Sequence, residues 1–359
     1  MQAAAGERGH RVSPVEMLKR QLARTTHRIH TLPVVILELT NRCNCRCLMC
    51  DIWQAGVGAQ ELTTEEVRPH LVRFKKLGVR HVVLSGGEPL LHHDPWALCA
   101  MLRAHGVAKI TLLSTGLLLA QRRADVLRWC DAAIVSLDGS REVHDAIRNV
   151  PRAYERLAEG VAALKAADPG FRVTARCVIQ RQNYADLPRI VDAAHETGLD
   201  GISFLAADVS STAFNHPEGG LGERTTGIAL TPQDVAELGR VLEDMIVRYA
   251  ADLEAGFIAE SGDKLRRLAR YAAALNGDGD FPPVRCNAPW VSTVIEADGT
   301  VRPCFFHRPL GNLRQQPLDQ ILNSEGAVAF RRSLDVTRDP TCRTCVCSLH
   351  VGLRSDVLA

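Results

Sequence analysis

Along much of this chain, the spacing of apolar and polar residues alternates between a period typical of strands and a period typical of helices. Six short runs rich in β-branched and other apolar residues are typical of buried strands, and segments with helical periodicity separate them. Parallel strands linked by right-handed helical crossovers form either a doubly wound sheet or a barrel-like arc. The pattern therefore predicts six β/α units. Their strands are Val34 to Leu39, His81 to Leu84, Lys109 to Leu113, Ala132 to Leu137, Phe171 to Ile179 and Gly201 to Leu205.

Capping residues mark the limits of two predicted helices. Thr63 opens a capping box with the glutamate three residues later, and Gly78 is placed to end that helix. Pro69 lies inside the same helix, removes one hydrogen bond and is expected to bend it. Near the N-terminus, Ser13 and the proline after it begin an amphipathic helix, whose apolar side is expected to pack on the outside of the barrel. That side carries Val15, Leu18, Leu22 and Ile29.

Composition and charge exclude several classes of protein. The 43 Lys and Arg nearly balance the 41 Asp and Glu, so neither the basic stripe of a nucleic-acid binder nor a polybasic membrane patch is indicated. The N-terminus lacks the order of a signal peptide, and the longest apolar stretch, Ile110 to Ala120, is short and interrupted. We therefore expect a cytoplasmic protein without nucleic-acid or membrane partners. Because the cytosol keeps thiols reduced, the 12 cysteines indicate metal binding rather than disulfides.

The densest group of cysteines directly follows the first predicted strand. Residues 37–50 read Leu-Glu-Leu-Thr-Asn-Arg-Cys-Asn-Cys-Arg-Cys-Leu-Met-Cys, which gives Cys43, Cys47 and Cys50 the spacing C-x3-C-x2-C. Three thiolates in one loop can ligate three irons of a [4Fe-4S] cluster and leave the fourth iron open to a ligand. Cys45 supplies a fourth thiol, so a four-cysteine zinc site is the alternative.

A second motif, Gly86-Gly87-Glu88-Pro89, ends the next strand. Glycines let the backbone approach a ligand closely, and the Glu88 carboxylate can accept a charge-assisted hydrogen bond from an ammonium group. Together with the cysteine spacing, this turn resembles the signature of the radical S-adenosylmethionine (SAM) superfamily, over roughly residues 33–210. The resemblance implies that Gly86, Gly87, Glu88 and Pro89 bind SAM. Ligand-binding residues at the carboxyl ends of strands favour a partial (β/α)6 TIM-like barrel over a doubly wound sheet.

Later strand ends extend the resemblance. Thr115 lies in a Ser-Thr-Gly segment where the family commonly has Thr-Asn-Gly. Ser-Leu-Asp-Gly from Ser136, followed by His-Asp-Ala-Ile-Arg148, resembles the segment after the fourth strand in members with auxiliary clusters. The resemblance implies a ribose contact at Ser136, an adenine neighbour at Met49, and further SAM-site residues at Thr115, Asp138 and Arg148. A plain turn at Asp138 and a surface salt bridge at Arg148 are the alternatives.

Five cysteines near the C-terminus form a second group. Cys286 and Cys304 follow the spacing C-x12-G-x4-C, and Cys342, Cys345 and Cys347 follow C-x2-C-x-C. This arrangement resembles the SPASM and Twitch extensions of radical SAM enzymes. Five thiols can fully ligate one [4Fe-4S] cluster, which we assign to the first four of them, with Cys347 as an alternative ligand. A four-cysteine zinc knot is the competing interpretation.

These motifs divide the chain into four predicted parts. A helical extension covers residues 1–32, and the core barrel covers residues 33–210. A Gly-rich polar loop then opens a helical connecting segment at residues 211–280, and the auxiliary-cluster domain covers residues 281–350.

The resemblance implies a radical SAM oxidoreductase with SAM, two [4Fe-4S] clusters and an electron donor of the flavodoxin or ferredoxin type. Such an enzyme cleaves SAM reductively to a 5′-deoxyadenosyl radical, which abstracts hydrogen from a substrate. The leading hypothesis is oxidation or epimerisation of a small hydroxylated metabolite, such as an aminocyclitol, sugar or nucleoside. The alternative is a maturase that modifies a ribosomally made peptide. A non-enzymatic electron carrier or zinc scaffold would leave the open-iron spacing without a purpose.

Five further side chains are candidates for roles near the substrate. Cys177, near the end of the fifth predicted strand, is a candidate hydrogen donor. The alternative is a small core residue, because free cysteine is among the most buried residue types. Candidate substrate contacts are Arg176, Asp208, Asn215 and His307.

Overall fold

One curved sheet organises residues 12–358, the part of the chain that this computed structural model describes; residues 1–11 of the predicted extension lie outside it. The strand order is β6-β5-β4-β3-β2-β1-β7-β8-β9. Strands β1 to β6 run parallel to one another, so all six predicted strands are present. They are β1 Val34–Thr40, β2 His81–Gly86, β3 Lys109–Ser114, β4 Ala132–Ser136, β5 Arg172–Ile179 and β6 Ile202–Ala206.

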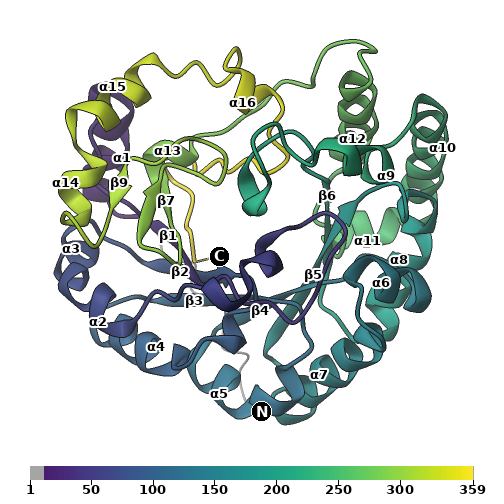
Figure 1. The fold of residues 1–359 in the computed structure, drawn as a ribbon, viewed down its shortest axis with the longest axis horizontal. Helices are drawn as coiled ribbons and strands as arrows, with labels where there is room; N and C mark the ends of the chain where they lie inside the picture. Colours follow the sequence, from purple (N-terminus) through teal and green to yellow (C-terminus); the bar gives the residue numbers. More distant parts are fainter. Residues whose placement is uncertain (1–11, 359) are drawn as a thin grey trace, which may run out of the picture.

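Helices cover the outer face of the sheet and complete the predicted partial (β/α)6 barrel (Figure 1). Apolar side chains between strands and helices, among them Leu37, Leu84 and Leu112, form the main core. None of the described helices is both long and apolar enough to cross a membrane. The helices between the strands are α2 Thr64–Val67, α3 Leu71–Lys76, α4 Pro95–Ala104, α5 Leu119–Trp129, α6 Arg141–Arg148, α7 Ala153–Ala167 and α8 Leu187–Glu196.

The first crossover shows how local sequence sets helix limits. The Thr63 hydroxyl accepts from the Glu66 backbone N–H and the Glu66 carboxylate accepts from the Thr63 N–H, which is the predicted capping box. Pro69 interrupts the helix as expected, because α2 ends before it and a short 3-10 turn leads into α3. Gly78 then ends the segment with φ of 68°.

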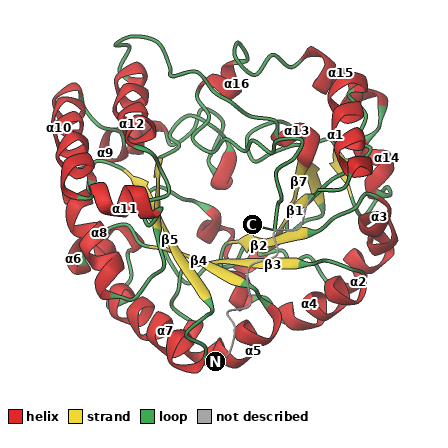
Figure 2. Ribbon diagram, turned by 180° about the vertical axis from the view of Figure 1, so that it is seen from behind, coloured by secondary structure: helices red, strands yellow, loops and turns green. Residues whose placement is uncertain are grey.

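The C-terminal part continues the barrel sheet instead of forming a separate layer. After the connecting helices, β7 pairs in parallel with β1, with Val34 opposite Ser292, and β8 and β9 follow antiparallel. The edge of β1 that β2 leaves free offers unpaired backbone groups, and β7 satisfies them. In Figure 2, β7 lies beside β1, with α13 nearby. The elements are α9 Thr225–Ile228, α10 Pro232–Arg248, α11 Ala250–Ala255, α12 Gly262–Leu275, α13 Ala288–Val291, β7 Ser292–Ile295, β8 Thr300–Arg302, β9 Gly311–Asn312, α14 Leu318–Leu322, α15 Glu325–Ser333 and α16 Pro340–Arg343.

The last residues of the described chain pack into the interior of the barrel near the starts of the strands. Val357 packs with the buried cluster that includes Val34 and Ile36. Lys109 Nζ, at the start of β3, donates to the Leu358 carbonyl at 3.0 Å. This segment lies beyond residue 350, where the auxiliary domain was predicted to end.

The N-terminal helix α1, Pro14–Thr26, packs through a different side from the one predicted. Val15 and Leu18 are 63% and 59% exposed, so the expected apolar contact with the barrel is wrong for them, whereas Ile29, beyond the helix, is buried in the main core. The buried residues of α1 are Arg20 and Ala23. The Arg20 guanidinium pairs with Glu16 and donates to the carbonyls of Gly352 and Ser355 at 2.9 and 2.8 Å. The helix therefore holds the C-terminal segment through polar contacts that apolar periodicity does not reveal.

Replacing Arg20 with Ala should destabilise the protein by about 2 to 4 kcal/mol, because two backbone acceptors lose a buried charged donor. Chemical denaturation of the reconstituted protein measures this change, and hydrogen exchange should accelerate in residues 352–358. Arg24→Ala on the same helix is the matched control, because Arg24 is exposed. The free energy of unfolding of Arg24→Ala should differ from that of the wild type by no more than about 0.5 kcal/mol. Equal effects of the two variants would contradict the role given to Arg20.

Candidate functional site

The first cysteine loop lies over the carboxyl end of β1 and is held there by backbone contacts. The Arg46 N–H donates to the Arg148 carbonyl at 3.0 Å, and the Leu48 N–H donates to the Ile147 carbonyl at 3.1 Å. These bonds tie the loop to the end of α6. The loop carries four cysteines that all line one cavity, namely Cys43, Cys45, Cys47 and Cys50.

The spacing of the cysteine sulfurs fits an iron-sulfur cluster better than zinc. Tetrahedral zinc binds thiolates at about 2.3 Å, which brings their sulfurs to within about 4 Å of one another. Among the described residues, no three cysteine sulfurs lie within 4.8 Å of one another, in either cysteine group. The described cysteines therefore lack the tight sulfur group of a zinc site, and their donor type fits [4Fe-4S] clusters.

Arg148 provides a buried positive charge beside the first cysteine loop. Its Nη1 donates to Cys47 Sγ at 3.4 Å, and its Nη2 forms an ion pair with Asp138. A hydrogen bond with Cys45 and the positive charge of Arg148 lower the pKa of Cys47 to about 6. The alternative of a surface salt bridge at Arg148 does not describe this pair, because Asp138 is fully buried and Arg148 nearly so.

Gly86 and Gly87 allow the ends of β1 and β2 to touch. The Gly87 N–H donates to the Thr40 carbonyl at 2.7 Å, and the Glu88 N–H donates to the Arg42 carbonyl at 2.8 Å. A Cβ at Gly86 would lie 2.4 Å from the Thr40 oxygen, and one at Gly87 would lie 2.2 Å from the Arg42 oxygen. Both glycines also line the cavity. The close approach is therefore made first to the protein's own backbone.

Glu88 is buried beside the cavity and is fully engaged by the protein. Its carboxylate accepts from the Ser114 hydroxyl at 3.0 Å, and from both the N–H and the hydroxyl of Thr115 at 2.7 Å. Burial raises its pKa, and these hydrogen bonds oppose the rise. Glu88 thus joins the end of β2 to the end of β3, and it positions Thr115. The contact with a SAM ammonium group stays a prediction.

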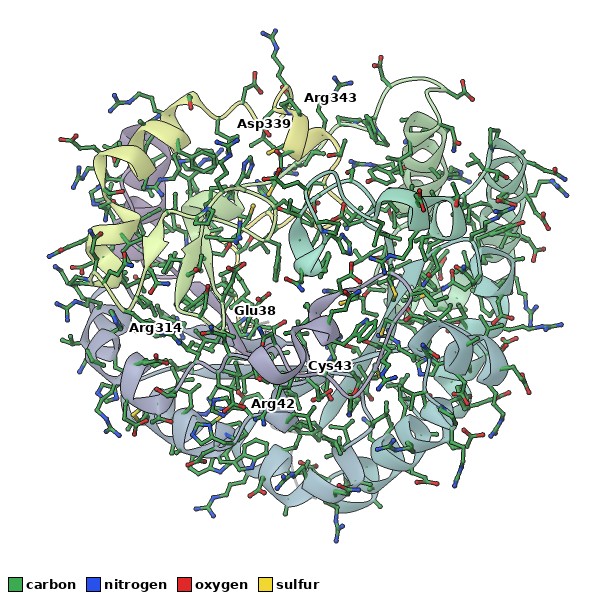
Figure 3. The ribbon with its side chains drawn as sticks, in the orientation of Figure 1. Glu38, Arg42, Cys43, Arg314, Asp339 and Arg343 are labelled. Carbon is green, nitrogen blue, oxygen red and sulfur yellow. The ribbon has the colours of Figure 1, made fainter. Side chains whose placement is uncertain are left out.

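A cavity of about 240 Å³ lies inside the barrel at the carboxyl ends of the strands. It extends from the first cysteine loop, where Cys43 lies near the centre of the molecule in Figure 3, to Cys347 of the second group. Of the predicted SAM-site residues, Asp138, Glu88 and Pro89 do not line it. Those that do are Met49, Gly86, Gly87, Thr115, Ser136 and Arg148.

Cys177 lies on the other face of β5. Arg176 and Val178 line the cavity, and side chains alternate between faces along a strand. Cys177 is fully buried in the core between the sheet and the helices, where Asn183 Nδ2 lies 3.7 Å from its sulfur. This placement matches the alternative of a small core residue and gives no support to a role as hydrogen donor.

The second cysteine group surrounds a buried histidine. His307 Nε2 lies 3.3 Å from Cys342 Sγ and 3.8 Å from a carboxylate oxygen of Asp339. Burial raises the pKa of Cys304, and the charges of Cys286 and Cys347 raise it further, so these three thiols are electrostatic neighbours. Burial likewise raises the pKa of Cys345, where Cys347 and Cys304 again contribute. The five cysteines predicted to share one site are therefore brought together.

The predicted substrate contacts separate into two groups. Arg176 and Asp208 line the cavity. Asn215 instead donates to the Asp51 carbonyl at 3.1 Å, and so holds the loop after β6 against the first cysteine loop. His307 faces Cys342 as described above.

Glu38, near the middle of β1, is a cavity residue that the sequence analysis missed. Its carboxylate has no hydrogen-bond partner among the described residues and faces the cavity (Figure 3). Burial raises its pKa to about 8, and the nearby carboxylate of Glu296 adds to the rise. The sequence could have revealed Glu38 because it is a single charged residue inside an apolar strand, and a carboxylate is rarely buried without a function.

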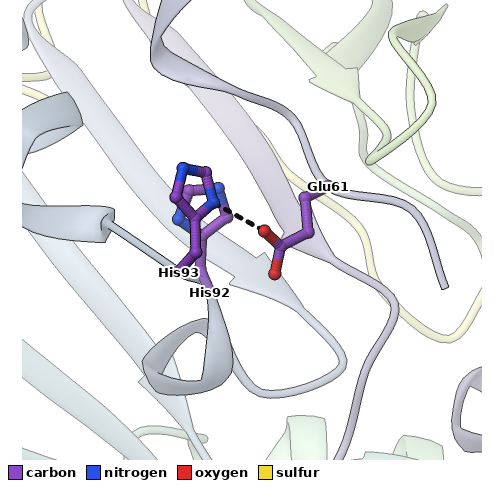
Figure 4. A group of neighbouring side chains, drawn as sticks. All are labelled: Glu61, His92 and His93. Carbon is purple, nitrogen blue, oxygen red and sulfur yellow. Dashed lines mark hydrogen bonds and ion pairs between the residues drawn. The ribbon is translucent and has the colours of Figure 1, made fainter.

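A third group of possible metal ligands, Glu61, His92 and His93, lies outside the cavity (Figure 4). His93 Nδ1 lies 2.6 Å from a Glu61 oxygen. Both ring nitrogens of His92 are engaged, because Nδ1 accepts from the Asp94 N–H at 3.1 Å and Nε2 donates to the Leu62 carbonyl at 3.2 Å. His92 thus has no lone pair for a metal, and the group serves to hold the first cysteine loop through the Arg42–Glu61 ion pair.

Comparisons with known proteins agree with this geometry. The family profile of the radical SAM superfamily matches residues 37–194, and that of the SPASM iron-sulfur cluster-binding domain matches residues 286–346. The PqqA peptide cyclase of Rhizobium meliloti (strain 1021) is 32% identical over 339 residues, which cover 90% of this chain and 82% of that protein. The Fe-coproporphyrin III synthase of Methanosarcina barkeri (strain Fusaro / DSM 804) is 30% identical over 80% of this chain and 73% of that protein.

Other matches are more partial or concern the fold alone. The Pre-heme d1 synthase of Dinoroseobacter shibae (strain DSM 16493 / NCIMB 14021 / DFL 12) is 36% identical over 172 residues, and this chain spans only 42% of its length. The crystal structure of Streptococcus suis SuiB bound to precursor peptide SuiA superposes with a TM-score of 0.64 at 15% identity, covering 96% of this chain and 79% of that chain.

Replacing Gly87 with Ala should destabilise the protein by about 2 to 4 kcal/mol, because the added methyl group collides with the Arg42 carbonyl. Iron content at the first cysteine loop should fall with it. Chemical denaturation and iron analysis measure the two effects. Gly239→Ala in α10 is the control, because a Cβ there meets no atom within 4 Å. It should stabilise the protein by about 0.5 to 1 kcal/mol. A fully stable Gly87→Ala protein would show that the close approach is dispensable.

Replacing Glu38 with Gln should remove a pH-dependent loss of stability. The unfolded carboxyl loses its proton near its ordinary pKa, whereas the folded one keeps its proton up to about pH 8. The folded state therefore binds more protons between these values, and the wild type loses stability as pH rises through this window. The free energy of unfolding of the Gln variant should equal that of the wild type near about pH 5. Near about pH 8.5 it should be higher than that of the wild type by about 1 to 3 kcal/mol, after allowance for water in the cavity.

Urea unfolding at several pH values tests this expectation. Glu218→Gln makes the same substitution at an exposed position outside the cavity and serves as the control. The assignment fails if the difference between Glu38→Gln and the wild type is the same at both ends of the pH range.

Proposed function

The chain belongs to the radical SAM superfamily and carries a SPASM iron-sulfur domain, and from this premise we propose that it modifies an amino-acid residue of a peptide. The family assignment implies [4Fe-4S] clusters and SAM as cofactors. The substrate and the reaction are the parts that we infer. The relative with the widest coverage among those described above is a peptide cyclase, which supports a peptide over the small hydroxylated metabolite expected first.

The residues of the first site divide into cluster ligands and SAM contacts. Cys43, Cys47 and Cys50 would hold the cluster with one open iron, and Cys45 would remain unligated. When bound, this cluster and SAM supply the radical that takes hydrogen from the substrate. The protein's contribution is position: the Gly86–Gly87 turn brings the backbone beside the loop, and Arg148 compensates the negative charge of the thiolates.

Further contacts to SAM would come from four side chains of the cavity wall. Thr115 is fixed by Glu88, and Ser136 ends β4. Met49 lies in the cysteine loop, where Gln180 Nε2 approaches its sulfur at 3.6 Å. Arg148 faces the same space. Asp138 would act indirectly, by fixing the Arg148 guanidinium.

The second site would hold a fully ligated cluster. Cys286, Cys304, Cys342 and Cys345 are the proposed ligands, and Cys347 is the alternative for one of them. Such a cluster supplies an electron acceptor, which favours net oxidation of the substrate over epimerisation. The cavity supports this assignment because it reaches Cys347 directly. Electrons for SAM cleavage would come from a flavodoxin- or ferredoxin-type donor.

The observation that carries the peptide assignment is a groove that borders the cavity. The wall of the cavity at β6 is shared with this groove of about 640 Å³ between β6, α12 and the last cysteines. The shared residues are Arg176, Leu205, Ala206, Val346 and Cys347. A groove that borders a cavity suits a peptide, because one residue can occupy the cavity while its neighbours lie in the groove. A small metabolite would need only the enclosed part.

Anaerobically reconstituted protein should contain about eight irons and convert SAM to 5′-deoxyadenosine with a strong reductant. The triple variant Cys43→Ala, Cys47→Ala, Cys50→Ala should keep about four irons and lose cleavage. Iron analysis and chromatography measure both quantities, and the matched control is Cys99→Ala at a buried helix position. Incubation with a peptide library should then give a peptide that loses two hydrogens at one residue. Turnover of a sugar, nucleoside or iron porphyrin, with every peptide unchanged, would overturn the peptide assignment.

A further inference from the structure

We infer that the groove beside β6 is the docking site for an acidic segment of the peptide substrate, with Arg176 as the anchor where the groove enters the cavity. The inference rests on the proposed function and adds the chemistry by which the substrate is recognised. The groove is bounded by β6, by α12 and by residues 282–285 and 343–350.

The charged side chains of this groove are almost all positive. Five cations line it, and Glu260 is its only carboxylate among the described residues. This excess of positive charge is concentrated on one face, since the whole chain carries a formal net charge of only +2. A concave surface of one sign attracts a ligand of the other sign and raises its local concentration. The cations are Arg176, Lys264, Arg267, Arg285 and Arg343.

Several of these cations have no partner within the described chain. Arg176, Lys264 and Arg285 form no ion pair within 4.0 Å there. The Arg176 Nε atom is in addition buried without a hydrogen-bond partner. The Arg176 guanidinium is thus free to donate, and a carboxylate can accept from a guanidinium through two parallel hydrogen bonds.

The single carboxylate of the groove is already engaged. Glu260 accepts from the Phe204 backbone N–H at 3.0 Å, so it caps part of the free edge of β6. Burial raises the pKa of Glu260, while Lys264 and Arg176 oppose that rise. Arg343 is also paired, with Asp280 at 3.5 Å, so Arg176, Lys264 and Arg285 are the cations that an incoming acidic segment would meet without an ion-pair partner among the described residues.

The backbone at this face also suits an extended chain. The sheet ends at β6, whose outer side is bridged at Ile202 by Ile258 and capped at Phe204 by the Glu260 carboxylate. Leu205 and Ala206, further along the strand, line the groove. A peptide lying beside them would have apolar contacts next to the strand edge and carboxylate contacts across the groove. Its path leads past Arg176 and Cys347 into the cavity.

Binding of two fluorescein-labelled peptides to the reconstituted holoprotein tests the inference. One peptide carries glutamate at alternate positions among alanines, and the other carries glutamine at the same positions. Anaerobic fluorescence anisotropy should show the glutamate peptide binding about tenfold tighter at about 50 mM salt. The difference should shrink at about 500 mM salt, because the charges are screened. Equal affinity of the two peptides at low salt would overturn the inference.

A matched pair of charge reversals locates the binding site. Lys264→Glu places a negative charge in the groove, whereas Arg270→Glu makes the same change at an exposed position of α12 that does not line it. Lys264→Glu should weaken binding of the glutamate peptide about tenfold, and Arg270→Glu should change it less than about twofold. Circular dichroism and iron content check that both variants are intact. Equal effects of the two reversals would overturn the groove assignment.

The modification assay separates failure of this inference from failure of the proposed function. If library peptides are modified regardless of their acidic residues, the proposed peptide modification is supported and the acidic docking site is contradicted. The opposite result is that the glutamate peptide binds as predicted and loses affinity in Lys264→Glu, but no peptide is modified. In that case the docking site is supported and the proposed function is contradicted.

Discussion

The contact between the ends of β1 and β2 is the constraint on which the rest of the site depends. Two backbone hydrogen bonds join Gly87 to Thr40 and Glu88 to Arg42, at a distance that leaves no room for a Cβ. This contact fixes the start of the first cysteine loop relative to the Gly-Gly turn. Glu88 in turn fixes the end of β3, because its carboxylate accepts a hydrogen bond from the Thr115 N–H. The cavity wall is therefore set by backbone geometry before any cofactor contact is made.

Buried charge is distributed around the cavity in a consistent way. Arg148 lies beside the thiols of the first loop and is balanced by Asp138. Arg176 lies near Cys347 and lowers the pKa of that thiol, although burial raises it more. Each cysteine group thus has one guanidinium near it, which compensates part of the charge that several thiolates would bring into a low-dielectric interior.

Local patterns predicted most of the barrel because its determinants are local. Strand runs, the capping box at Thr63 and the cysteine spacings each lie within one short segment, and the structure contains all of them. The pairing of β7 with β1 was missed because it joins segments far apart in the chain. The buried side of α1 was missed because Arg20 packs through hydrogen bonds rather than apolar contact. Glu38 was visible as a charge in an apolar strand, but its exposure to a cavity depends on the closed arc.

The β1–β7 pairing also bears on how the chain reaches this fold. Val34 lies opposite Ser292, so β1 is paired on both sides only after most of the chain has been synthesised. Contacts between such distant segments form slowly, because the entropy of closing a long loop opposes them. Until then, one edge of a strongly apolar strand is open to any other extended chain. The nascent barrel should accordingly be most prone to aggregation before β7 arrives, and synthesis at low temperature or with chaperones should raise the soluble yield.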